Sequence, residues 1–176
     1  MKTSVLVTGG AGYIGSHTLV EFLAAGYHPI VLDNFCNSSP GVLRRVEALT
    51  GRSVTWREGD VRDASVLDAL FSLAREQGAP VECVVHFAGL KAVGESVAKP
   101  LDYYDNNVYG SIVLLQAMER AQVRRIVFSS SATVYGEPRS LPYTEDHPLA
   151  PTNPYGRTKA MVEAMLADWC AADPGR

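Results

Sequence analysis

Short apolar segments alternate with longer amphipathic segments along most of the chain. Continuously apolar short segments are typical of strands buried on both faces of a parallel sheet, and apolar residues repeated every three or four positions are typical of helices. The expected strands are Val5–Val7, Pro29–Leu32, Ser53–Arg57, Glu82–His86 and Arg125–Ser129. The first expected helix runs through Leu19 and Leu23, and the last begins at Pro154. Between them, helices are expected over Val42–Leu49, Ala64–Arg75 and Leu101–Arg120. Right-handed crossovers between such strands predict an α/β fold with a doubly wound parallel sheet, the Rossmann fold.

The chain has the length of one ordinary domain, because 176 residues can enclose a substantial core and neither a repeat nor a linker interrupts them. We therefore expect a single domain over residues 1–176. The proline-rich segment Gly136–Thr152 is the one long stretch that has neither the apolar pattern of a strand nor that of a helix. It predicts a loop that crosses over the site.

Composition and charge narrow the classes of function. The sequence is 47% hydrophobic and 20% charged, which is typical of a globular protein, and its formal net charge of −3 argues against binding to nucleic acid or to an anionic membrane. The three cysteines have no metal-binding or CxxC spacing, so we expect free thiols in a reducing compartment and no metal site. The first apolar run is broken by Gly9-Gly10, which predicts neither a signal peptide nor a membrane span, and hence a cytoplasmic protein.

A glycine-rich loop follows the first expected strand. The residues from Gly10 to Gly15 fit the pattern GxGxxG, and Gly9, Gly12 and Gly15 also fit GxxGxxG. Between a strand and a helix, this pattern lets the backbone approach a pyrophosphate and directs helix N-terminal amides at it. Asp33 ends the second strand, where a carboxylate accepts ribose hydroxyls and repels a 2′-phosphate, which favours NAD over NADP. Asp33 is otherwise explained as a turn or helix-cap residue.

Three further strand ends carry small or polar residues at the edge where such a sheet binds ligands. Asp60-Val61 follow the third strand and could meet adenine, whereas Phe87-Ala88-Gly89 follow the fourth and would let the backbone approach a ribose or phosphate. An ordinary turn or loop explains either segment equally well. Ser131 follows the fifth strand, where its hydroxyl could hydrogen-bond a substrate oxygen and Tyr155.

Tyr155 and Lys159 stand one turn apart at the start of the last helix. Asn153-Pro154 is a typical helix start, so Tyr155 falls in the first turn with Lys159 on the same face. A neighbouring ammonium favours the ionised form of a phenol, although desolvation opposes this, and the pair can act as a proton shuttle. Alone, the pair is better explained as a tyrosine and a lysine that share a helix face by chance.

Taken in order, these features resemble the extended short-chain dehydrogenase/reductase family and, within it, the UDP-glucose 4-epimerases. The resemblance covers essentially the whole chain. Its most specific stretches are Thr8–Gly15, Leu32–Asn34, His86–Ser96, Tyr103–Val108 and Ser129–Gly136, and the segment around Lys91 discriminates best.

The resemblance assigns roles residue by residue. It implies that Tyr155 takes the proton of the sugar 4-hydroxyl, that Ser131 hydrogen-bonds that oxygen, and that Lys159 favours the phenolate and binds the nicotinamide ribose. NAD would accept a hydride from C4 and return it to the other face of a 4-keto sugar. The positions that match NAD-contacting residues are Gly9, Gly12, Tyr13, Ile14, Gly15, Asp33, Asn34, Asn37, Ser38, Asp60, Val61, Phe87, Ala88, Gly89, Lys91, Asn106, Tyr155 and Lys159, and those that match substrate-contacting residues are Lys91, Ser131, Thr133 and Tyr155.

The implied function is epimerisation at C4 of a UDP-hexose, UDP-glucose or UDP-galactose, in galactose metabolism. The competing reaction is that of a sugar-nucleotide dehydratase, which needs an additional acid and base near the sugar. Related dehydratases place Asp-Glu after the serine position, whereas this chain has Ala132-Thr133-Val134, so the epimerase is preferred. A second class of function is an NAD-binding module that is catalytically silent by itself, and a third alternative is another sugar-nucleotide-modifying member of the family.

The resemblance also implies that family members continue with further strands and a smaller C-terminal domain that grips the UDP-sugar. A chain ending at Arg176 is expected to leave the strand Arg125–Ser129 as an exposed edge and the substrate pocket without one wall. A fragment, a shortened gene product or half of a complex would each explain this end. Apolar residues on more than one side of the last helix fit either a homodimer, as expected for the full-length family, or simple core packing.

Overall fold

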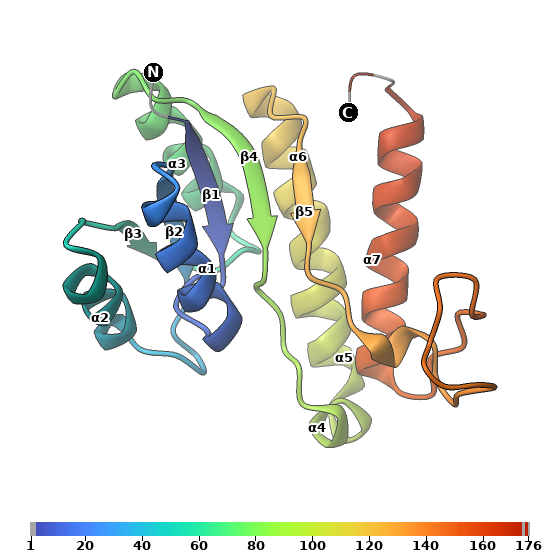
Figure 1. Cartoon of the computed structure of the whole chain (residues 1–176). Coiled ribbons are helices and arrows are strands. Elements are labelled where there is room, and N and C mark those ends of the chain that lie inside the picture. Colours follow the sequence, from blue (N-terminus) through green and yellow to red (C-terminus); the bar gives the residue numbers. More distant parts are fainter. Residues whose placement is uncertain (1–2, 174, 176) are drawn as a thin grey trace. The chain divides into compact units, whose positions relative to one another are not determined.

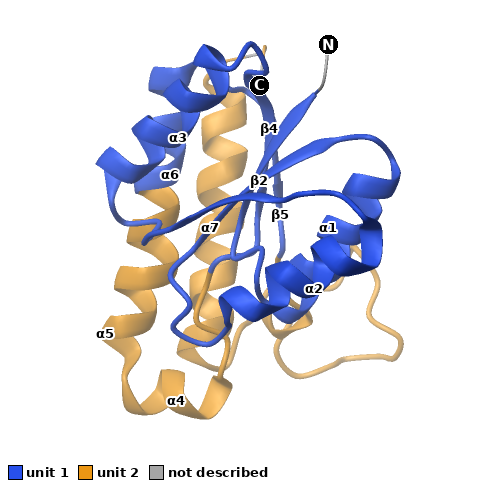
Figure 2. Ribbon diagram, turned by 90° about the vertical axis from the view of Figure 1, so that its left-hand side faces the viewer, with its two compact units in different colours: residues 1–88, 113–129 blue, residues 89–112, 130–176 orange. Residues whose placement is uncertain are grey.

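The computed structural model describes residues 3–173 and 175 (Figure 1). Met1, Lys2, Pro174 and Arg176 lie outside these residues. The expectation about a chain that ends at Arg176 therefore falls partly on residues outside the described ones. The chain divides into two compact units (Figure 2): unit 1 comprises residues 1–88 and 113–129, and unit 2 comprises residues 89–112 and 130–176.

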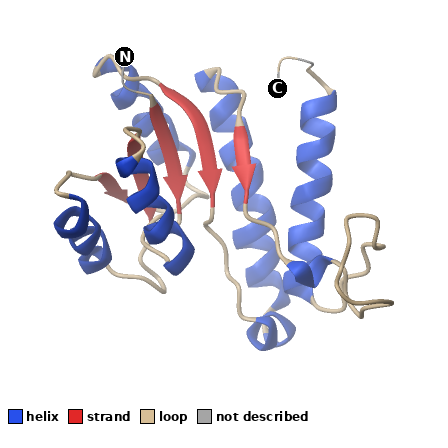
Figure 3. Ribbon diagram, viewed as in Figure 1, coloured by secondary structure: helices blue, strands red, loops and turns tan. Residues whose placement is uncertain are grey.

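Unit 1 contains a five-stranded sheet in the order β3-β2-β1-β4-β5, in which every neighbouring pair of strands is parallel (Figure 3). The strands are β1 (Ser4–Thr8), β2 (His28–Asp33), β3 (Thr55–Glu58), β4 (Val81–His86) and β5 (Ile126–Phe128). Each expected strand is present, with ends shifted by one or two residues. The order reverses at β1 and β4, which is where a doubly wound sheet binds its ligand. The predicted fold is confirmed.

The helices of unit 1 cover both faces of this sheet (Figure 2). They are α1 (Tyr13–Ala24), α2 (Pro40–Thr50), α3 (Ala64–Glu76) and the part of α6 (Gly110–Ala121) that begins at Val113. Val5, Val7 and Val31 form one buried cluster with Leu19 of α1 and Leu43 of α2. The intervening residues Leu6, Ile30 and Leu32 point to the opposite face and are equally buried, so the central strands β1 and β2 are apolar on both sides.

Unit 2 is helical. It contains α4 (Val93–Ala98), α5 (Pro100–Tyr103), the π-helical turn η1 (Tyr104–Tyr109), the first three residues of α6, the 3₁₀ turn η2 (Ala132–Val134) and α7 (Pro154–Ala171). The single helix predicted over Leu101–Arg120 is therefore interrupted by a π-helical turn. Hydrophobic periodicity cannot detect such a turn, because it adds one residue to a helix that otherwise continues.

The predicted loop over Gly136–Thr152 contains neither helix nor strand. Its own aromatic residues hold it together. The Tyr143 hydroxyl donates to the carbonyl of Gly136 at 2.7 Å, and the Tyr143 ring stacks on that of Tyr135 with ring centroids 5.1 Å apart. The placement of this loop over the site stays a prediction.

Candidate active site

The glycine loop joins β1 to α1 in a conformation that only glycine fits at two positions. Gly9 has a φ of +69°, and a Cβ there would lie 2.6 Å from the amide nitrogen of Ala88. A Cβ on Gly15, in the first turn of α1, would lie 2.5 Å from the carbonyl oxygen of Gly9. Gly12 occupies the cap position of α1, and no side chain of a described residue caps this helix. The loop therefore packs tightly beneath a helix start that is available to an anion.

Asp33, at the end of β2, ties the glycine loop to the loop that follows β2. Its Oδ2 accepts a hydrogen bond from the amide of Ala11 at 2.9 Å, and its Oδ1 accepts from the amide of Phe35 at 2.9 Å and from Ser38 Oγ at 2.8 Å. The residue is buried, and Oδ2 keeps capacity for one further donor. Such an arrangement can accept one ribose hydroxyl and disfavours a second anion.

Asp60 lies beyond the end of β3 and is held by Arg62 and Asn34. The Arg62 guanidinium donates to both carboxylate oxygens, at 2.8 and 2.7 Å, and Asn34 Nδ2 donates at 3.1 Å. The hydrogen bonds from Arg62 lower the pKa of Asp60 to about 2. Val61 is buried beside it. The sequence prediction that these residues meet adenine stays a prediction.

The end of β4 is fixed against β1 by side chains beneath the glycine loop. Thr8 Oγ1 accepts from the amide of Ala88 at 3.3 Å and lies 2.6 Å from Nδ1 of the buried His86. The amide of Phe87 donates to the carbonyl of Thr8 at 3.0 Å. Two of the predicted cofactor residues, Phe87 and Ala88, are thus brought beside Gly9.

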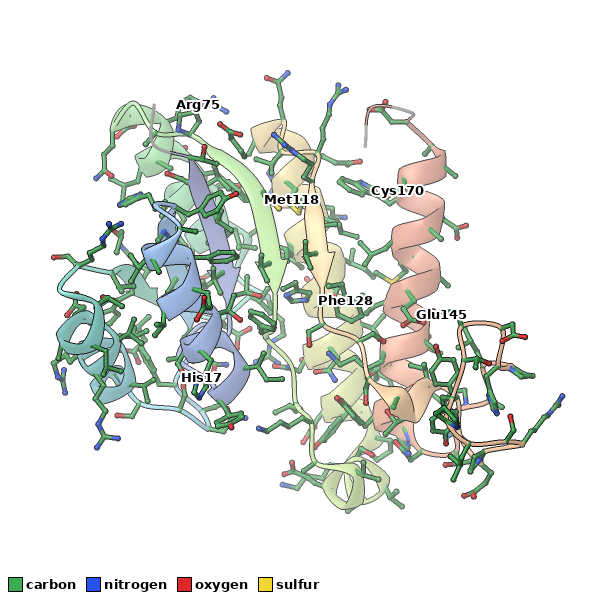
Figure 4. All side chains as sticks on the ribbon, viewed as in Figure 1. His17, Arg75, Met118, Phe128, Glu145 and Cys170 are labelled. Carbon is green, nitrogen blue, oxygen red and sulfur yellow. The ribbon has the colours of Figure 1, made fainter. Side chains whose placement is uncertain are left out.

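A pocket of about 390 Å³ opens beside the glycine loop in unit 1. Gly12 lines it from the loop, Asn37 and Ser38 from the segment after Asp33, and Tyr13 and His17 from α1. Figure 4 labels His17 on this helix. Its volume lies in the range of small-molecule sites. Four predicted cofactor residues therefore line one pocket. Ile14 does not line it, and both Tyr13 and Ile14 are largely exposed.

In unit 2, α7 begins as the sequence predicted. The side chain of Asn153 caps the helix by accepting from the amide of Gly156 at 2.8 Å, and Pro154 occupies the first turn. Tyr155 is half-buried in that turn. Lys159 follows one turn later, and its Nζ lies 5.9 Å from the centroid of the Tyr155 ring.

Lys159 is a buried cation, with only 6% of the residue exposed. Burial lowers its pKa from 10.5 to about 8, although the carboxylate of Glu163 acts in the opposite direction. An ammonium that deprotonates this close to neutral pH can share in proton transfer as well as stabilise a phenolate.

The Ser131 segment packs against the start of α7. A Cβ on Gly156 would lie 2.7 Å from the carbonyl oxygen of Thr133, so the backbone of η2 touches the residue after Tyr155. Ser131 Oγ accepts from the amide of Thr133 at 3.3 Å and from its Oγ1 at 2.9 Å. The hydroxyls of Ser131 and Thr133 form a pair in this segment, both half-buried.

The sequence indicated Asn106 in η1, but its neighbour Asn107 makes the structural connections. Asn107 Oδ1 accepts from the amide of Leu90 at 2.8 Å, while its Nδ2 donates to the carbonyl of Leu90 at 2.9 Å and to Thr158 Oγ1 at 3.1 Å. The predicted Gly89 also belongs here, because a Cβ on it would lie 3.8 Å from Lys159 Nζ. The predicted Lys91 is exposed. No local sequence signal distinguishes Asn107 from Asn106.

No helix in the described part of the chain is both long and apolar enough to cross a membrane. Among the same residues, no group of three or more histidine, cysteine, aspartate or glutamate side chains is arranged to hold a metal ion.

A family model described as GDP-mannose 4,6 dehydratase matches residues 6–174, nearly the whole chain. The chain belongs to this family. Among curated proteins, it is 55% identical over 171 residues to UDP-glucose 4-epimerase of Yersinia pestis and 55% identical over 170 residues to that of Bacillus subtilis, in each case covering 97% of this chain and 49% of the relative. The chain thus spans about half the length of the curated relatives it matches.

Solved structures of the family agree with the fold. The structure of UDP-glucose 4-epimerase from Bifidobacterium longum, in complex with NAD+ and UDP, matches with a TM-score of 0.92 and 53% identity, covering 98% of this chain and 50% of that one. An epimerase from Stenotrophomonas maltophila with bound NAD and formylated UDP-arabinopyranose matches with a TM-score of 0.90 and 46% identity, covering 97% of this chain and 49% of that one. The resemblance to the UDP-glucose 4-epimerases, as an N-terminal portion, is confirmed.

Proposed function

We propose that this chain binds NAD and carries the proton-transfer residues for epimerisation at C4 of a UDP-hexose. The observation that carries this proposal is Lys159, a buried amine with a pKa of about 8, placed over the Tyr155 ring at a capped helix start.

The dinucleotide fits the features of unit 1. The pyrophosphate would lie at the start of α1, where Gly9 and Gly15 keep the backbone compact and no side chain competes. Asp33 Oδ2 would accept a hydroxyl of the adenosine ribose, and its charge would repel a 2′-phosphate, which favours NAD over NADP. NAD, when bound, supplies a hydride acceptor for the carbon that bears the sugar 4-hydroxyl.

The residues of unit 2 would remove the proton of that hydroxyl and later return it. Tyr155 Oη would take the proton as the C4–H bond breaks, and Ser131 or Thr133 would orient the same oxygen with a hydroxyl. The charge on Lys159 would stabilise the phenolate that forms. By making the tyrosine a stronger acid, the same charge would favour return of the proton to the sugar oxygen when the hydride reaches the opposite face of C4. The sugar then differs from the starting sugar only in configuration, so no net oxidation occurs.

The choice of epimerisation over dehydration rests on η2. Loss of water from a sugar nucleotide needs an additional acid and base beside the sugar. The turn after Ser131 offers Ala132, Thr133 and Val134 and no carboxylate. The family model bears the name of a dehydratase, whereas the curated relatives named above are epimerases.

The test is interconversion of UDP-glucose and UDP-galactose by the purified chain supplied with NAD, with Tyr155→Phe as the matched variant. Phenylalanine keeps the ring beside Lys159 and removes only the proton-carrying oxygen. We expect at least a hundredfold loss of kcat in the variant, the size typical of a lost general base. Equal rates in the two proteins would refute the assignment of Tyr155.

A second candidate is an NAD-binding module that is silent alone, favoured because the glycine loop and Asp33 lie entirely within unit 1 and because the chain spans about half of its relatives. This module would bind NAD in calorimetry without turnover, and would gain turnover when the C-terminal half of a relative is added. Failure to bind NAD would exclude both candidates.

A further inference from the structure

Ser96 of α4 holds the backbone of Tyr155, a residue 59 positions later in the sequence. The amide of Tyr155 donates to Ser96 Oγ at 3.2 Å, and Ser96 Oγ donates in turn to the carbonyl of Val93 at 2.6 Å. Ser96 is fully buried. The hydrogen and one lone pair of this hydroxyl are therefore directed by the protein.

This bond completes the capping of α7. The first amides of a helix lack partners within the helix, and here Pro154 has no amide hydrogen while Gly156 is capped by the side chain of Asn153. The amide of Tyr155 is the remaining one in this first turn, and its partner comes from a distant segment. The local sequence thus supplies one cap, and α4 supplies the other.

Tyr103 of α5 reaches the same residue from its ring side. Its ring meets the Tyr155 ring edge-on, with centroids 6.5 Å apart and an interplanar angle of 80°. The Tyr103 hydroxyl accepts from the amide of Ala92 at 3.0 Å and donates to the carbonyl of Ala92, at 2.8 Å, or to Glu95 Oε2, at 3.0 Å. Tyr103 is fully buried, so its ring is a fixed surface, and its hydroxyl braces the segment that presents Ser96.

We propose that Ser96 and Tyr103 are positioning residues for Tyr155: Ser96 fixes its backbone, and Tyr103 fixes its ring and braces α4. This role rests on the proposed function of Tyr155. It also gives a function to the segment from Ala92 to Ser96, none of whose residues is among the predicted cofactor or substrate contacts. A proton-transfer group must be held within tenths of an ångström of its partner, and a first-turn residue on an incompletely capped helix is not held so closely.

Amide hydrogen exchange of the full chain tests the backbone contact without requiring turnover. In Ser96→Ala we expect exchange at the Tyr155 amide to accelerate at least tenfold while exchange at the Gly156 amide is unchanged. The matched variant Asn153→Ala should give the reverse pattern. Unchanged exchange at Tyr155 in Ser96→Ala would overturn the proposal.

Steady-state kinetics test the consequence. In Ser96→Ala we expect kcat to fall about tenfold, or about 1.4 kcal/mol in the barrier, with KM within twofold. Ser4→Ala, which removes an equally buried hydroxyl that bonds His28 instead, should change neither. An unchanged kcat in Ser96→Ala would overturn the positioning of Tyr155 by Ser96 for catalysis, even if hydrogen exchange at the Tyr155 amide became faster.

Tyr103→Phe tests the role of Tyr103 separately from that of Ser96. The variant keeps the ring that contacts Tyr155 and removes the hydroxyl that bonds Ala92 and Glu95. We expect faster exchange at the Ala92 amide and, through the loosened α4, at the Tyr155 amide. No change at Tyr155 would remove Tyr103 from the proposal. If the wild-type chain shows no turnover even when the C-terminal half of a relative is added, the proposed function fails, and the exchange patterns still decide whether Ser96 and Tyr103 hold Tyr155.

Discussion

Replacing Lys159 by methionine is expected to stabilise the folded chain while removing its activity. Methionine has nearly the same length and carries no charge, so it relieves the desolvation of a residue that is 6% exposed. Burial lowers the pKa of Lys159 to about 8 in the folded state, against 10.5 for an ordinary lysine side chain. At 1.36 kcal/mol per unit, the cation destabilises the folded state by about 3 kcal/mol at pH 7.

The pH dependence gives this prediction its sign. Between pH 8 and pH 10.5 the unfolded lysine keeps its proton while the folded one has lost it, so the unfolded state binds more protons and stability rises with pH. Below pH 8 the buried charge of Lys159 destabilises the folded state in full, and above pH 10.5 this destabilisation is gone. The variant lacks this group, so its advantage over the wild type should shrink from about 3 kcal/mol at pH 7 to below about 1 kcal/mol at pH 10.

Urea unfolding of both proteins without NAD, at pH 7, 8, 9 and 10, measures this difference. Subtracting one curve from the other removes every titration that the two proteins share. Lys99→Met is the control, because the Lys99 side chain is 61% exposed and pairs with Glu95 on the surface, so its effect should be small and nearly constant. A Lys159→Met protein no more stable than the wild type at pH 7, or a difference that does not change with pH, would refute the argument from burial.

Two other substitutions test unit 1. Gly15→Ala places a Cβ 2.5 Å from the carbonyl oxygen of Gly9, so the loop must shift; we expect a loss of about 1–3 kcal/mol in urea unfolding and at least tenfold weaker NAD binding by calorimetry. Gly94→Ala, where a Cβ meets nothing within 4 Å, should instead be neutral or stabilising by up to about 1 kcal/mol, and equal behaviour of the two variants would contradict the packing argument. Arg62→Met should raise the pKa of Asp60 from about 2 and, because the pair is partly exposed, cost only about 1 kcal/mol above pH 4, where the carboxylate is charged in both states. An acid-unfolding midpoint that is identical in Arg62→Met and the wild type would show that this pair does not stabilise the fold.

The sequence predicted the features that depend on neighbouring residues. The alternation of apolar segments indicated the five strands to within one or two residues, and Asn153-Pro154 correctly indicated the start of α7. The π-helical turn η1 was not predicted, because its residues continue the apolar period of a helix. The helix α4 was not predicted either, since it has only six residues and no side-chain cap.

The two units position their chemistry by different physical means, and this explains which parts of the site the sequence could predict. In unit 1, side-chain bonds from Asp33 and Thr8 act together with backbone sterics, through a positive φ at Gly9 and a close approach at Gly15, and the steric constraints leave glycines at fixed spacing. In unit 2, positioning bonds run from side chains to a backbone 59 residues away, from Ser96 to Tyr155, and 17 residues away, from Asn107 to Leu90. A serine or asparagine at such a position resembles any other polar residue until its partner is known. Substitutions that damage Tyr155 are therefore expected far from it in the sequence, in α4 and η1, whereas those that damage the dinucleotide loop should cluster within it.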